Sequence, residues 1–182
     1  LYDLTTLQRD ANRILGYTAQ QTLDYAQSLY EKKLCTYPRT DSRYLTDDMD
    51  VGVRAIVICS AGVCDMEAPD VALTTQVCNS KKVSDHHAII PTMVAGETDL
   101  NTLPAGEREI LKLIARQVLR AVCEAHRFRE TTAEISCGGY TFTAKGKSIQ
   151  NIGWKVYNDK EQKDRVLPDL TEGGELKVVS TE

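Results

Sequence analysis

The sequence predicts an α+β multidomain fragment of a longer chain: a mainly helical domain over residues 1–127, then an antiparallel, β-rich partial domain over residues 128–182. Apolar residues recur at helical spacing through most of the first part, and the period changes from 3.6 to 2 at about Phe128. Paired glycines then separate the alternating stretches. Hydrophobic residues make up 42% of the chain, which is enough for a core.

Two helices are expected at the start of the chain. Thr5 is a candidate N-cap for the first helix, and Gly16 is its expected stop. Thr18 and Gln21 have the spacing of a capping box for the second helix. The stretch "TYPRTDS" should end that helix, because Pro38 has no N–H and disfavours a helical conformation at the residue before it. A tyrosine is therefore expected at a helix exit.

Two more long helices and one extended segment are expected before the boundary. Thr46 is a good N-cap for a third helix, whereas residues 62–82 show no clear period. The stretch "SDHHAIIPT" at 84–92 is short and apolar and contains a proline, so we expect it to lie extended near the core. A helix over 105–126 should carry cations on its outer face at every fourth residue: Arg108, Lys112, Arg116 and Arg120.

After the boundary, "AEISCGGYTFTAK" is the strongest local signal. Gly138-Gly139 suits the two-residue turn of a hairpin, which would place four side chains on one face: Ile135, Cys137, Tyr140 and Phe142. The same alternation predicts further strands around residues 152–156 and 176–178. So few strands bury little area, so we expect them to be part of a larger β unit.

Composition narrows the class of protein. A net charge of -4 and a pI near 5.5 argue against a protein that coats nucleic acid without specificity. No stretch has the pattern of a signal peptide or a membrane span, so no membrane partner is expected. The six cysteines form no Cys-x-x-Cys pair, which favours reduced thiols in an intracellular protein and predicts no metal site within this chain.

The stretch "LCTYPRTDSRYL" at 34–45 carries the most specific chemistry. A tyrosine phenol has a pKa near 10, so only about one in a thousand is the nucleophilic phenolate at neutral pH. A nearby cation favours the charged form. In an extended chain Tyr37 and Arg39 point to the same side, so Arg39 could bind a phosphate that Tyr37 attacks. Spacing alone favours a structural tyrosine, since such pairs are common on loops.

Four stretches, in this order, resemble the type IA DNA topoisomerases and within them the topoisomerase III branch: "LTTLQRDAN", "TLDYAQSLYEKKLCTYPRTDSRYL", "SDHHAIIPT" and "FTAKGKSIQNIGWKVY". The resemblance covers essentially the whole chain. It implies a parent enzyme that breaks one DNA strand through a 5′-phosphotyrosine link and reseals it, relaxing or decatenating DNA without ATP. It also implies that the partners are single-stranded DNA and the other domains of the parent. The location that it implies for the parent is the bacterial cytoplasm, at the nucleoid.

The resemblance assigns roles to residues that match the family's motifs. Tyr37 matches the nucleophile, and Arg39 matches an arginine that assists cleavage. His86 matches a histidine that approaches the scissile phosphate, whereas His87 is expected to be a packing or surface residue. Gln27 and Thr40 are also expected to contact the DNA. Two acidic residues are expected to support the site: Glu31, which would orient Arg39, and Asp41.

The resemblance places Mg²⁺ in a Toprim domain that these 182 residues do not include, so no cofactor is expected in this fragment and no relaxation activity from it alone. The acids at 47–50 are typical of a helix start and are not assigned to a metal. Two alternatives stay open. One is another enzyme that forms phosphotyrosine, such as a tyrosine recombinase or a rolling-circle nickase. The other is a helical DNA-binding or interaction module without catalysis.

Overall fold

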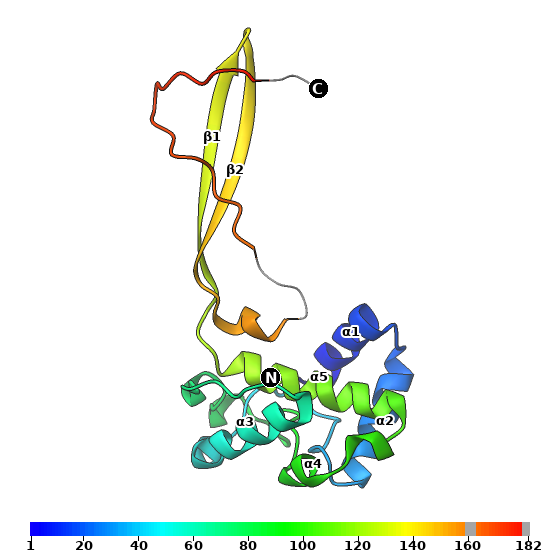
Figure 1. Ribbon diagram of the computed structural model, residues 1–182. Helices are drawn as coiled ribbons and strands as arrows, with labels where there is room; N and C mark the ends of the chain where they lie inside the picture. Colours follow the sequence, from blue (N-terminus) through cyan, green and yellow to red (C-terminus); the bar gives the residue numbers. More distant parts are fainter. Residues whose placement is uncertain (159–162, 180–182) are drawn as a thin grey trace. The chain divides into compact units, whose positions relative to one another are not determined.

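The computed structural model describes residues 1–158 and 163–179, in two compact units, Leu1–Glu124 and Ala125–Glu182 (Figure 1). The first unit is helical and the second is built on an antiparallel hairpin, which confirms the α+β class. The boundary predicted after residue 127 falls within the first residues of the second unit. Across the described ranges, no helix is both long and apolar enough to span a bilayer.

Helices α1 (Leu4–Leu15) and α2 (Ala19–Glu31) begin the first unit. The predicted N-cap of α1 is wrong by two residues, because the carboxylate of Asp3 accepts the Thr6 N–H at 2.6 Å and Thr6 completes a capping box. The predicted stop is confirmed, since Gly16 has φ 73°. The box of Thr18 and Gln21 at the start of α2 is also confirmed.

The end of α2 turns the chain back sharply. Lys33 has φ 62°, in the left-handed region. The Lys33 N–H donates to Tyr30 O, and the Leu34 N–H donates to Leu29 O, both at 2.8 Å. These two bonds make a Schellman motif, which satisfies carbonyls that the helix end would leave unpaired. The turn leads directly into the loop that carries Tyr37.

Three later helices complete the first unit: α3 (Asp50–Cys64), α4 (Met93–Glu97) and α5 (Ala105–Ala121). Thr46 is not the cap of α3, because a 3₁₀ turn over Asp47–Met49 intervenes and the Thr46 side chain makes no capping bond. Helix α5 contacts α1, α2 and α3, and it supplies much of the core, with Ile110, Leu111 and Ile114 fully buried. The four cations predicted on its outer face are each half-buried.

The segment predicted at 84–92 enters the core from residue 88 on, whereas residues 84–86 form an exposed bend. It forms antiparallel bridges from Ile89 to Tyr2 and from Pro91 to Cys35. Ala88, Ile89 and Ile90 are at most 2% exposed. The segment therefore connects the start of the chain to the tyrosine loop through buried backbone.

The second unit contains β1 (Arg127–Cys137) and β2 (Tyr140–Asn151), joined by the predicted Gly138-Gly139 turn. Both glycines have positive φ, at 57° and 83°, which a two-residue hairpin turn requires. Ile135 pairs with Phe142 and Cys137 pairs with Tyr140, which confirms the predicted shared face.

The other predicted strands are wrong. Residues Gly153–Tyr157 form a 3₁₀ helix, because Gly153 takes φ 50° and its N–H donates to the Asn151 side chain. Within 163–179, residues 176–178 form no strand, and the bridge between Arg165 and Lys147 is the pairing seen there. Alternation makes a strand only where a second strand offers its N–H and C=O groups.

Candidate active site

Backbone and hydroxyl hydrogen bonds hold the tyrosine loop, residues 36–45, against residues 82–92. The Thr36 N–H donates to Ile90 O at 2.9 Å, and the Ala88 N–H donates to Tyr44 O at 2.9 Å. Between these two bonds, the buried Ser42 hydroxyl donates to Lys82 O at 2.9 Å. Residues 40 to 54 positions apart in sequence are thus fixed side by side, and each of the two segments carries part of the predicted site.

Tyr37 lies half-buried between two other rings. Its ring centroid is 4.6 Å from that of His86, with the planes at 51°, and 5.3 Å from that of Tyr30, with the planes at 73°. Pro38 beside it is buried. Among the described residues, the Tyr37 hydroxyl makes no hydrogen bond. The ring is held by packing, and its oxygen remains available to a ligand.

The two adjacent histidines have different surroundings. The His86 side chain is exposed and contacts the Tyr37 ring. His87 is half-buried, and its Nδ1 lies 2.8 Å from the Ala88 carbonyl oxygen. His86 is thus the histidine that faces the candidate nucleophile.

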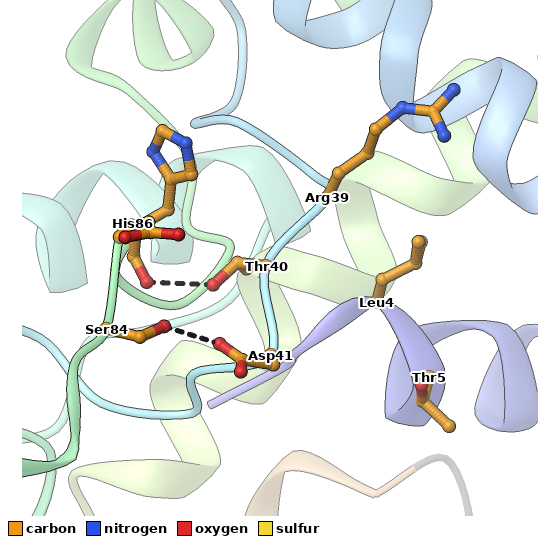
Figure 2. A pocket seen from close by; sticks show the side chains of 8 residues that line it. Leu4, Thr5, Arg39, Thr40, Asp41, Ser84 and His86 are labelled. Carbon is orange, nitrogen blue, oxygen red and sulfur yellow. Dashed lines mark hydrogen bonds between the residues drawn. The ribbon is translucent and has the colours of Figure 1, made fainter.

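A pocket of about 400 Å³ opens beside His86. Four of the predicted site residues line this pocket: Arg39, Thr40, Asp41 and His86. The rest of its lining comes from α1 and from the 82–92 segment: Leu4, Thr5, Ser84 and Asp85. Figure 2 shows the Arg39 side chain extending away from His86 along the pocket's other side. Arg39 is exposed, and in the described part of the chain its guanidinium makes no ion pair or hydrogen bond. A phosphate can use all of its donors.

Thr40 and Asp41 hold the pocket wall together (Figure 2). The Thr40 hydroxyl donates to the His86 carbonyl at 2.8 Å and accepts the Ser42 N–H at 3.1 Å, and Thr40 is buried. The Asp41 carboxylate accepts a hydrogen bond from the Ser84 hydroxyl at 2.7 Å. Both side chains therefore link the tyrosine loop to the histidine segment, and a contact of Thr40 with DNA stays a prediction.

Gln27 and Glu31 lie one turn apart on α2, and Gln27 Nε2 donates to Glu31 Oε1 at 3.2 Å. They are not among the residues that line the pocket. No ion pair joins Glu31 to Arg39 in the described ranges. The expected roles of this pair at the DNA and at Arg39 stay predictions.

Two nearby groups are poor competitors for the nucleophile's role. Burial raises the pKa of the Cys35 thiol to about 12, so this thiol is neutral at physiological pH. Burial and a 2.8 Å hydrogen bond to Asp10 raise the pKa of Tyr2 above its ordinary value. Each group is shielded by the same packing that builds the core.

Sequence reasoning did not place Tyr30 at this site. Its signal was present, as an aromatic residue in the last turn before the tyrosine loop. It also missed Ser42 as a crosslink between the two segments. Within the described ranges, no three His, Cys, Asp or Glu side chains cluster in a way that could hold a metal ion.

Comparisons with known proteins all point to one family, the DNA topoisomerases. A family model described as DNA topoisomerase matches residues 1–182. DNA topoisomerase 3 of Bacillus licheniformis is 41% identical over 194 aligned positions, which cover 99% of this chain and 26% of that protein. The Bacillus subtilis protein of the same name is 39% identical, with 98% and 26% covered. The Bacillus thuringiensis protein is 41% identical, with 94% and 24% covered. The chain therefore spans about a quarter of the length of these relatives.

Proposed function

The chain belongs to the type IA DNA topoisomerase family, and on that premise we propose that Tyr37 is the nucleophile with which its full-length parent breaks and reseals one DNA strand. The observation that carries the proposal is the placement of the Tyr37 ring against His86, with a hydroxyl that makes no hydrogen bond within the described residues. Because Tyr37 is only half-buried, a hydroxyl without a protein partner is open to water or to a ligand.

The proposed reaction exchanges one phosphoester for another. The Tyr37 hydroxyl loses its proton and its oxygen attacks the phosphorus, so that an Oη–P bond forms while the P–O3′ bond breaks. The departing 3′ oxygen takes up a proton and leaves as a hydroxyl. The 5′ end of the strand is then held on Tyr37. Reversal of the same steps reseals the strand, and since the number of phosphoester bonds is constant, no ATP is consumed.

Arg39 and His86 are proposed to act on the phosphate during this exchange. The Arg39 guanidinium can bind two phosphate oxygens through its planar donors. A ring N–H of His86 can donate to an oxygen of the same phosphate, where negative charge gathers as the bond to Tyr37 forms. Thr40 and Asp41 would keep His86 beside Tyr37 through their bonds to the 82–92 segment.

We infer that the substrate of the parent is single-stranded DNA and that the outcome is relaxation or decatenation, in the bacterial cytoplasm at the nucleoid. The family resemblance supports these points. Mg²⁺ is proposed to bind in another domain of the parent, and the family resemblance supports this point as well. No step at Tyr37, Arg39 or His86 is assigned to the ion.

Covalent capture of DNA tests the proposal. In the full-length parent, Tyr37→Phe should abolish attachment of a labelled single-stranded oligonucleotide that survives denaturation, while the Kd for the oligonucleotide changes little. Only the reacting oxygen is lost. Tyr44→Phe is the matched control, because Tyr44 lies on the same loop with its hydroxyl occupied by Lys82, and it should capture DNA normally. Labelled DNA on the denatured Tyr37→Phe protein would show that the nucleophile is misassigned.

A further inference from the structure

We propose that Tyr30 is a positioning residue, which holds the Tyr37 ring in the orientation for attack. The inference rests on the proposed role of Tyr37. Tyr30 lies in the last full turn of α2, and the Schellman turn that follows brings the chain back so that Tyr37 meets it. The two rings pack edge to face at 5.3 Å, within the range that favours aromatic pairs.

Tyr37 needs such a neighbour because little else fixes its side chain. A tyrosine side chain has several staggered orientations about its first bond, and each of them carries the hydroxyl to a different place. No hydrogen bond selects among them in the described structure, since the Tyr37 oxygen has no partner there. The ring contacts with Tyr30 and His86 therefore select the orientation.

Of these two contacts, the one with Tyr30 is better suited to persist through the reaction. His86 is exposed and is proposed to bind the phosphate, so its ring is drawn to the ligand when DNA arrives. Tyr30 stands on a regular helix whose inner face is fixed by fully buried Ala26 and Leu29. A ring fixed to a rigid helix can hold the nucleophile while the histidine engages the substrate.

The exposure of Tyr30 separates this role from simple core packing. Its side chain is 41% exposed, so it contributes less to the core than its buried neighbours do. Truncation should therefore affect the reaction more than folding. A second use of an exposed aromatic ring beside a strand-cleaving site is to stack on a nucleobase. If Tyr30 stacked on a base, its truncation would weaken binding of the oligonucleotide. If Tyr30 positions Tyr37, its truncation lowers the rate at saturation.

The test compares Tyr30→Leu and Tyr30→Phe in the full-length parent by single-turnover cleavage and religation of a single-stranded oligonucleotide at saturation. Tyr30→Phe keeps the ring and should react within about twofold of the wild type. Tyr30→Leu should slow both directions by about 2- to 12-fold, which corresponds to the loss of one aromatic pair. Both directions share one transition state, so the cleavage equilibrium should stay unchanged. Ile14→Ala is the matched control, since Ile14 is 42% exposed on α1 and should react normally.

Three results would overturn the inference. They are a wild-type rate for Tyr30→Leu, an equal loss for Tyr30→Phe, and a loss confined to the oligonucleotide Kd, which would indicate base stacking. A melting temperature that falls equally in Tyr30→Leu and Ile14→Ala, with slowing only in the former, excludes misfolding as the cause. Failure of the proposed function is distinct, because the wild-type parent would then carry no DNA on Tyr37 whatever the result at Tyr30.

Discussion

His86 and His87 are neighbours in the chain, but of the two it is His86 whose ring packs against Tyr37. Its ring lies 4.6 Å from the Tyr37 ring, while His87 turns toward the Ala88 carbonyl. His86 ends an exposed bend over residues 84–86, whereas His87 begins the stretch that enters the core. The "DHHAIIPT" stretch thus presents one histidine to the site and one to the protein.

We expect His86→Ala to slow DNA cleavage and religation by about ten- to a hundredfold in the full-length parent, the cost of one charge-assisted hydrogen bond made mainly in the transition state. His87→Ala is the matched control and should have a much smaller effect. Single-turnover rates, with folding matched by circular dichroism, measure both. Equal rates, or a larger loss for His87→Ala, would mean that the wrong histidine was assigned.

Among the elements, the crossing of α2 and α5 depends on the absence of a side chain. A Cβ placed on Gly106 would lie 2.3 Å from Tyr25 Cζ. The Tyr25 ring cannot easily move aside, because it packs edge to face on Tyr17 at 5.3 Å. Next to this contact, buried Glu107 accepts hydrogen bonds from Ser28 and Lys32 of the α2 segment. The two helices are thus joined by the packing of the Tyr25 ring on the Gly106 backbone and by a buried carboxylate.

Gly106→Ala should therefore lower the free energy of unfolding by about 1–3 kcal/mol, the usual range for overpacking. Gly62→Ala in α3 is the matched control, since its Cβ would meet nothing within 4 Å and it should be neutral or stabilising by up to about 1 kcal/mol. Urea unfolding of the 182-residue chain, followed by helical circular dichroism, gives both values. Equal stabilities for the two variants would show that α2 and α5 are farther apart than described.

The helices were predictable where a local signal marks their ends. Residues close together in sequence determine three of these features: the capping box of Thr18 and Gln21, the stop at Gly16, and the Gly138-Gly139 turn. The structure of residues 152–156 was not predictable in this way, because a strand forms only where another segment supplies backbone N–H and C=O groups to pair with. The tyrosine motif was identified by resemblance. The contact of Tyr30 with Tyr37 depends on the left-handed conformation of Lys33, which the local sequence does not predict.

On the scale of the whole molecule, the chain carries the candidate nucleophile and phosphate-binding side chains but spans about a quarter of the relatives' length. Its described residues contain no carboxylate cluster suited to a metal. The phosphate site is open, with Arg39 and His86 both exposed. Attack by a phenol requires exclusion of water and a fixed strand, which one open pocket does not provide.

We expect the isolated 182-residue chain to fold but not to relax supercoiled plasmid, with or without Mg²⁺. Agarose-gel relaxation assays, with the full-length parent as the positive control, measure this outcome. Relaxation by the purified chain that disappears with Tyr37→Phe would mean that these residues hold the complete catalytic machinery.

The most direct test of the central claim is to find the atom that DNA is attached to. The full-length parent is trapped by denaturation during cleavage of a single-stranded oligonucleotide, digested with nuclease and protease, and its peptides are sequenced by mass spectrometry. The account predicts a nucleotide 5′-phosphate on Tyr37, within the peptide that contains "LCTYPR", and none on Tyr30 or Tyr44. An adduct on another residue, or DNA held through its 3′ end, would contradict it.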